Sequence, residues 1–275
     1  MINTESIKAK LLTLAKEDNM THQLLLNRLG EQRFLARLAQ SQWSSHFILK
    51  GGSLMYQLLR SARRTRDVDF SLQNISNDMQ KLSVIIEEIA RKDLQDAFEF
   101  LSPKTSILEH PRMPYPGLQI RLDFLFAKMK GSVWMDLALG DEVVPVQQQV
   151  QVLRYKETPL IGEDFTLLAY PPEQVFAEKF QPAVLLGKAN SRMRDYYDMH
   201  RLIEENVLNK NKLKQDIERI FTQRSTPLTQ KISLSENDIA HLQVPWKKFV
   251  DTNPILDAVK NIELVIRQIN DFLQA

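Results

Sequence analysis

Two aspartates, Asp67 and Asp69, are the residues of this sequence best suited to chemistry, because they flank one valine in the strand-like segment 67–70. Side chains at i and i+2 of a strand project from the same face, so both carboxylates lie on one side, about 7 Å apart along the backbone. Two carboxylates in this arrangement can bind a hard divalent cation such as Mg²⁺. The alternative is a pair of solvated acids at the end of a strand.

A Gly51-Gly52-Ser53 turn precedes this strand, between a short apolar strand at 46–49 and a helix at 54–59. Backbone N–H groups at a helix N-terminus hold phosphate, glycine lets the backbone approach closely, and the Ser53 hydroxyl adds a donor. An ordinary turn with a capping serine is the alternative. The order of the elements favours a phosphate cradle beside a metal-binding pair, as in phosphoryl and nucleotidyl transfer.

The segment 41–66 contains no acidic residue and several basic ones, so it attracts phosphates. Its lysine and arginines are Lys50, Arg60, Arg63, Arg64 and Arg66. We count Lys50, Arg63 and the neighbouring Thr65 among the nucleotide-binding candidates. A solvated helix end is the alternative interpretation.

A two-metal site usually needs a third carboxylate, and Asp123 and Asp136 stand on the two strands of a predicted hairpin, 118–127 and 132–139. Alternation puts Asp123 on the polar face of its strand, where solvation explains it. Asp136 lies in a strand that is apolar on both faces, and a buried charge is paired or binds metal. We therefore choose Asp136.

The helix that follows Pro172 carries Lys179 in the middle of its apolar face. A lysine there either snorkels to solvent or meets a buried anion. In the next predicted helix, 192–205, Asp195 borders the apolar face and would orient Lys179 or assist an acceptor hydroxyl. Arg194 and Asp198 have the spacing of a surface ion pair, and a proline at 182 predicts a kink or an early end of the first helix.

The elements that position these residues change in kind along the chain. Residues 4–40 have helical spacing, strands and helices alternate from 46 to 153, and a helix is predicted at 79–101. Beyond Pro171-Pro172 the pattern is mainly helical. The sequence predicts an α+β part at 1–165 and a helical part at 166–275.

Composition sets limits on function. At 275 residues and 43% hydrophobic, the chain can bury a sizeable core, and the absence of cysteine excludes disulfides, cysteine zinc sites, iron–sulfur clusters and thiol nucleophiles. No apolar run reaches the ~18 residues needed to cross a bilayer, and the N-terminus lacks a signal region. We therefore expect a cytoplasmic protein with no membrane association.

Five stretches together resemble the nucleotidyltransferase AbiEii/AbiGii toxin family, which includes MenT-like enzymes and falls within the DNA polymerase beta-like nucleotidyltransferase superfamily. The stretches are 47–53, 63–70 (the family's R-x-T-x-D-x-D), 134–141, 171–180 and 191–198. The similarity covers about residues 45–205. It implies a polymerase-beta-like core, a mixed sheet with helices at 1–165, and a C-terminal helical bundle at 166–275 that completes the active site.

The resemblance also implies an enzyme that transfers a nucleoside monophosphate from an NTP with Mg²⁺ or Mn²⁺. In that case Asp67, Asp69 and Asp136 bind the metals, the Gly51, Gly52 and Ser53 turn holds the triphosphate, and Lys179 and Asp195 complete the site. Relatives are toxins of toxin–antitoxin or phage-defence systems, some of which modify the 3′ end of tRNA. RNA, above all tRNA, is then the expected acceptor, and a cognate antitoxin protein an expected partner.

Two other functions stay open at this stage. A DxD glycosyltransferase would use Asp67 and Asp69 for a metal-bound sugar nucleotide, but here the glycine turn precedes the acids and a long nucleotide-binding βαβ half is missing. A catalytically inactive binding module of the same fold is the second, and the intact motifs argue against it.

Overall fold

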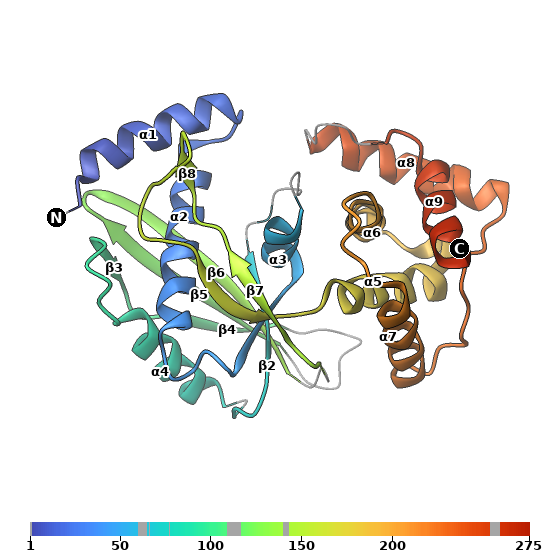
Figure 1. Ribbon diagram of the computed structural model, residues 1–275, viewed down its shortest axis with the longest axis horizontal. Coiled ribbons are helices and arrows are strands. Elements are labelled where there is room, and N and C mark those ends of the chain that lie inside the picture. The colour runs from blue at the N-terminus through green and yellow to red at the C-terminus, as the bar shows by residue number, and fades with distance from the viewer. Residues whose placement is uncertain are drawn as a thin grey trace. The chain divides into compact units, whose positions relative to one another are not determined.

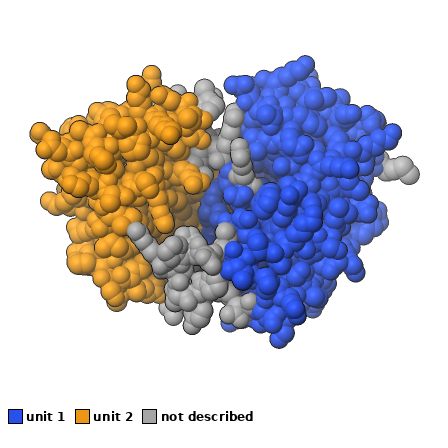
Figure 2. All heavy atoms as spheres, turned by 180° about the vertical axis from the view of Figure 1, so that it is seen from behind, with its two compact units in different colours: residues 1–53, 65–169 blue, residues 54–64, 170–275 orange. Residues whose placement is uncertain are grey.

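A computed structural model describes residues 2–59, 65, 67–76, 78–108, 117–139, 143–253 and 259–275. Its contacts divide the chain into two compact units (Figure 2). Unit 1 comprises residues 1–53 and 65–169, and unit 2 comprises residues 54–64 and 170–275. The boundary expected from the sequence is 165/166.

Unit 1 is built on a mixed sheet in the order β3–β5–β6–β2–β1–β10–β7, with β4 also paired to β5 (Figure 1). Its strands are β1 (Phe47–Lys50), β2 (Asp67–Leu72), β3 (Phe98–Phe100), β4 (Lys104–Leu108), β5 (Gly117–Phe126), β6 (Met129–Leu139), β7 (Val146–Val150) and β10 (Phe165–Ala169). The β2–β6 and β1–β10 pairs are parallel and the other pairs antiparallel. A separate two-stranded hairpin consists of β8 (Arg154–Tyr155) and β9 (Thr158–Pro159).

The helices of unit 1 are α1 (Thr4–Glu17), α2 (His22–Ala39), the start of α3 (Gly51–Leu58), and α4 (Met79–Ala90). Helix α2 packs on β6, β10, α1 and α4. A Cβ on Gly30 would lie 2.3 Å from the Phe124 ring, so a glycine is needed where α2 meets the apolar face of β5. That face is continuous with the buried residues Val133 and Met135 of β6.

A buried ion pair ties α2 to the segment before β3. Both Arg33 and Arg37 bind the Asp96 carboxylate at 2.7 Å, and all three side chains are nearly inaccessible to solvent. Burial by itself would raise the pKa of Asp96, but the hydrogen bonds from Arg37 and Arg33 outweigh it and lower that pKa. This cluster is part of the core of unit 1.

The predicted helix 79–101 is wrong in its second half, because α4 ends at Ala90 and β3 begins at Phe98. Asp93 accepts a hydrogen bond from the Gln95 backbone N–H, and Gln95 and Ala97 both have positive φ. Such an Asx turn competes with helical hydrogen bonds. The hairpin prediction is confirmed as β5 and β6, whereas β10 was not expected from the sequence.

Unit 2 is helical over its described part, with α5 (Pro172–Leu186), α6 (Met193–Glu204), α7 (Lys210–Gln223), α8 (Glu236–Thr252) and α9 (Ile262–Gln274) joined in part by a short 3₁₀ turn (Gly187–Ala189). The α+β class with a helical C-terminal part is thereby confirmed. Of the helices in the described ranges, none has both the length and the apolar character that a membrane crossing needs.

Helix α5 does not end early at its internal proline. Pro182 is buried, and the helix continues to Leu186. Proline lacks the N–H that would bond the carbonyl of Glu178 four residues earlier. Arg224, which follows α7, lies 3.4 Å from that carbonyl and also donates to Gln181 Oε1 at 3.1 Å. Of the two expected outcomes, a kink or an early end, the early end is therefore wrong, and Arg224 supplies an alternative donor for the freed carbonyl.

Candidate active site

The three predicted carboxylates lie on one face of the sheet of unit 1. Strands β2 and β6 pair in parallel with Asp69 opposite Asp136, and Asp67 opposite Trp134. Residues opposite each other in adjacent strands project from the same face, and Asp67 is two residues from Asp69. The alternating residues Val68 and Met135 are fully buried on the other face. The three acids therefore share the polar face, on neighbouring strands.

Asp136 is less buried than the sequence suggested. Its strand was expected to be apolar on both faces, but Asp136 and Trp134 are only half-buried while the intervening Met135 is inaccessible. Gln119 of β5, directly opposite, donates from Nε2 to Asp136 Oδ1 at 2.9 Å. Gln119 was not predicted from the sequence as a site residue, because only the pairing register of β5 and β6 brings it next to Asp136.

Asp123, the rejected candidate, shares this face but is already neutralised. Lys104 Nζ lies 2.9 Å and Arg121 Nε 2.8 Å from its two carboxylate oxygens. Partial burial raises the pKa of Asp123, but the hydrogen bonds from Lys104 and Arg121 outweigh it and lower that pKa. These ion pairs account for Asp123 without any further ligand.

The glycine turn is in contact with Asp69. Gly51 has φ +62°, a left-handed conformation that favours glycine, and a Cβ there would lie 1.9 Å from Asp69 Oδ2. The Gly52 N–H donates to the same oxygen at 3.2 Å. Lys50, the last residue of β1, is paired with Asp69 in the antiparallel register and so shares its face. The glycine turn, Lys50 and Asp69 therefore lie together at the end of β1.

Ser53 is held from two sides within unit 1. Its side chain is 2% exposed, and its hydroxyl lies 2.8 Å from Glu31 Oε1 and 3.2 Å from the carbonyl of Asp67. Thr65 Oγ1 donates to the same carbonyl at 3.2 Å. Contact of the Ser53 hydroxyl with a triphosphate stays a prediction, and it requires that hydroxyl to leave Glu31. Arg63 lies outside the described residues, as do Arg60, Arg64 and Arg66.

Lys179 and Asp195 meet inside unit 2. Lys179 Nζ lies 3.0 Å from Asp195 Oδ1 and 3.0 Å from Asp198 Oδ2, and the lysine side chain is 14% exposed. Asp198 is fully buried, so the expected surface pair with Arg194 is wrong. The lysine in the apolar face therefore contacts two carboxylates of α6, of which the one on Asp198 is buried. Whether Lys179 also reaches a substrate stays a prediction.

The donor chemistry of the polar face fits a hard cation. Mg²⁺ and Mn²⁺ prefer carboxylate oxygens, and Asp67, Asp69 and Asp136 supply them from adjacent strand positions. Asp69 is turned toward Gly52 N–H and Asp136 toward Gln119. Within the described ranges, no group of three His, Asp or Glu side chains is arranged to hold a metal ion as it stands. Cation binding would therefore need these side chains to rotate.

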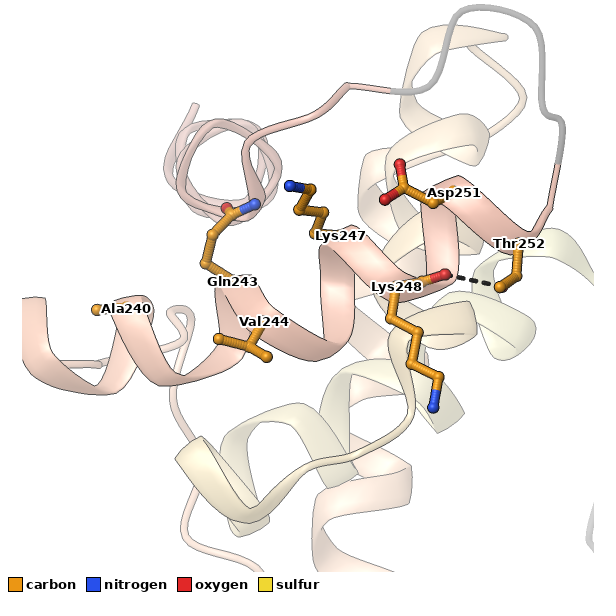
Figure 3. Close-up of a pocket in the computed structure, with 7 residues that line it drawn as sticks. All are labelled: Ala240, Gln243, Val244, Lys247, Lys248, Asp251 and Thr252. Atoms are coloured by element: carbon orange, nitrogen blue, oxygen red, sulfur yellow. Dashed lines mark hydrogen bonds between the residues drawn. The ribbon is translucent and has the colours of Figure 1, made fainter.

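A surface hollow of about 420 Å³ on α8 is unrelated to these acids (Figure 3). It is lined by Ala240, Gln243, Val244, Lys247, Lys248, Asp251 and Thr252 of that one helix. Its apolar part includes Val244, which is 73% exposed. Because these side chains offer neither a carboxylate pair nor a glycine turn, we assign the hollow no part in the chemistry.

Comparison with solved structures supports the fold. The crystal structure of JHP933 from Helicobacter pylori matches with a TM-score of 0.53 at 13% identity, over 92% of this chain and 91% of that chain. A putative nucleotidyltransferase from H. pylori matches with a TM-score of 0.52 at 13% identity, over 93% of this chain and 95% of that chain. Comparison with curated proteins found no match.

The family assignment comes from the sequence over most of its length. The family model described as "Nucleotidyl transferase AbiEii toxin, Type IV TA system" matches residues 33–265. This range contains the paired strands β2 and β6, the glycine turn, and Lys179 of α5 with its two carboxylate partners on α6. The chain belongs to the AbiEii nucleotidyltransferase toxin family of type IV toxin–antitoxin systems.

Proposed function

We propose that this nucleotidyltransferase moves a nucleoside monophosphate from an NTP to the 3′ hydroxyl of an RNA, with tRNA as the acceptor. The observation that carries the proposal is the register of β2 and β6, which sets Asp69 beside Asp136 and next to the Gly51–Gly52 turn. Carboxylates adjacent to backbone donors at a helix N-terminus suit a triphosphate with its counter-ion.

Each residue of the polar face has a role in this proposal. Asp67, Asp69 and Asp136 would hold Mg²⁺ or Mn²⁺, which would neutralise charge on the triphosphate and the leaving diphosphate. The Gly52 N–H, once Asp69 turns away from it, would donate to a phosphate oxygen, and Lys50 adds a positive charge on the same face. Gln119 would keep the Asp136 carboxylate oriented.

The helical unit would contribute Lys179 as a point charge for a triphosphate oxygen. Asp195 binds its ammonium at 3.0 Å and would set its direction. The buried Asp198 binds the same ammonium at 3.0 Å. The two carboxylates fix the position of the ammonium but also offset its charge, so contact with a triphosphate oxygen would require Lys179 to exchange one of them for the phosphate.

The acceptor is proposed from charge. Residues 41–66 contain five basic and no acidic side chains, the pattern that binds a phosphate backbone. A tRNA 3′ end is single-stranded and presents a free hydroxyl to an active site. The enzyme would therefore act in the cytoplasm, where NTPs and tRNA occur, and an antitoxin partner follows from the family.

Label transfer from α-³²P-NTPs tests the proposal directly. Each of the four NTPs is incubated with the protein, Mg²⁺ and either purified tRNA or total RNA, with EDTA and Asp69→Asn as controls. We expect labelled tRNA that loses its label when the terminal nucleotide is removed, and no transfer in either control. The affinity of the protein for RNA should also fall steeply between about 50 and 200 mM salt, because salt weakens contacts with several phosphates.

Other outcomes would reject the proposal in distinguishable ways. Label on protein alone would show that RNA is not the acceptor. Transfer of a sugar from a sugar nucleotide would favour the glycosyltransferase alternative. Nucleotide binding without any transfer to RNA or protein would favour an inactive binding module.

A further inference from the structure

Glu31 lies beside the candidate site, although nothing in the sequence motifs points to it. It belongs to α2, two residues before the range that the family model matches. The neighbouring residues of α2 pack in the core of unit 1: Gly30 lies against Phe124, and Gln32 and Arg33 are buried. Glu31 itself is half-buried, and α2 brings it to the first turn of α3.

One hydroxyl connects Glu31 to the strand that carries Asp67 and Asp69. Ser53 Oγ lies 2.8 Å from Glu31 Oε1 and 3.2 Å from the Asp67 carbonyl, and Ser53 is 2% exposed. Three elements, α2, α3 and β2, therefore meet at a single buried hydroxyl. Gly52, the residue before Ser53, donates its N–H to Asp69. A shift of Ser53 would move this donor as well.

The charge of Glu31 also acts on the site. The pKa of Glu31 is raised overall: burial raises it most strongly, the nearby Arg28 and the Ser53 hydrogen bond lower it, and the charges of Asp69 and Asp67 raise it further. A cation that binds among the three carboxyl groups favours the ionised form of Glu31, and by the same coupling the ionised Glu31 strengthens binding of the cation. By contrast, the buried Asp96 is held by two arginines and needs no further cation.

We propose that Glu31 is a positioning residue of this site, which fixes the first turn of α3 through Ser53 and strengthens cation binding at Asp67 and Asp69 by its charge. The proposal rests on the nucleotidyltransferase function argued above. It separates two effects. The hydrogen bond to Ser53 sets the geometry of the turn that receives the triphosphate, and the negative charge sets the affinity for the divalent ion.

Two substitutions distinguish these effects. Glu31→Gln keeps an oxygen that accepts from Ser53 and removes the charge, whereas Glu31→Ala removes both. The matched control is Glu17→Gln, at the exposed end of α1, which removes one charge from the same unit. Ser53→Ala removes the hydroxyl and leaves the charge of Glu31.

The readouts are Mn²⁺ binding by electron paramagnetic resonance, binding of a non-reactive NTP analogue by calorimetry, and thermal stability. We expect the affinity for Mn²⁺ to fall about fivefold in both Glu31 variants, because each loses one negative charge whose effect is partly screened by solvent. It should be unchanged in Glu17→Gln. Nucleotide affinity should fall about tenfold in Glu31→Ala and Ser53→Ala alike. The double variant should be no worse than Glu31→Ala, and Glu31→Gln should keep its melting temperature.

Wild-type Mn²⁺ affinity in Glu31→Gln would overturn the proposal, because a merely structural residue would behave in this way. Failure of the proposed function is separable from this result. If Asp69→Asn abolishes Mn²⁺ binding while Glu31→Gln leaves it intact, only the role of Glu31 is refuted. If the wild-type protein binds no Mn²⁺, both proposals are refuted.

Discussion

Replacement of Lys179 by methionine tests the ion pairs that this lysine makes with Asp195 and Asp198 in unit 2. From the sequence alone, methionine should suit the apolar face of α5, and stability should change little or rise. The structure reverses this expectation, because Lys179 Nζ binds two carboxylates at 3.0 Å and one of them, on Asp198, is 1% exposed. Methionine preserves the packing of the aliphatic stem but leaves Asp198 without the ammonium.

The expected cost follows from that burial. Removing one partner of a buried ion pair typically costs about 3–5 kcal/mol, because the remaining charge is uncompensated. We expect a loss in this range for Lys179→Met and a partial recovery in the double variant Lys179→Met/Asp198→Asn. The control is Lys188→Met: Lys188 is 68% exposed and 3.5 Å from Asp238, so its loss should cost at most about 1 kcal/mol.

Urea unfolding followed by circular dichroism gives these free energies, and label transfer to RNA gives the rate. Lys179→Met should also lower the rate by about 10²-fold or more if the ammonium stabilises the transition state. Free energies of unfolding that agree within about 1 kcal/mol for Lys179→Met and Lys188→Met would refute the argument about burial. A wild-type transfer rate in Lys179→Met would show that the lysine has only a structural role.

Three further substitutions test unit 1. Gly51→Ala should abolish transfer and destabilise the fold, because its Cβ would lie 1.9 Å from Asp69 Oδ2, whereas Gly187→Ala, at φ 50° and ψ −125° but with no contact closer than 3.7 Å, should leave transfer intact and cost about 1–3 kcal/mol in urea unfolding. Asp69→Asn should lose transfer and Mn²⁺ binding with a melting temperature near that of the wild type, since the asparagine oxygen still accepts from the turn; a large drop in melting temperature would contradict this. Asp96→Asn should lower stability by about 3–5 kcal/mol at pH 7. Because the pKa of Asp96 is lowered in the folded protein, its contribution is present above the ordinary value near 3.8 and is lost as pH falls through the folded pKa, so the variant should show a weaker acid dependence of stability in urea titrations from pH 7 to 2.

Local periodicity determines much of the candidate site. The two-residue period of a strand is sufficient to put Asp67 and Asp69 on one face, and the helical period is sufficient to put Lys179 in the apolar face of α5. The hairpin that carries Asp136 and the change from α+β to helical character also follow from local patterns. Each of these features depends on neighbours in the sequence, so the residues themselves specify it.

Contacts between residues far apart in the sequence determine the other features of the candidate site. The parallel register of β2 and β6 sets Asp69 beside Asp136, 67 positions later, and no local period specifies which strands pair or in which register. Packing of α6 on α5 buried Asp198, which helical spacing alone had placed at the surface. Glu31 reached Ser53 only because α2 folds back onto the sheet. A sequence pattern shows which side chains share a face, but their partners across the core are set by tertiary contacts whose residues lie far apart in the chain.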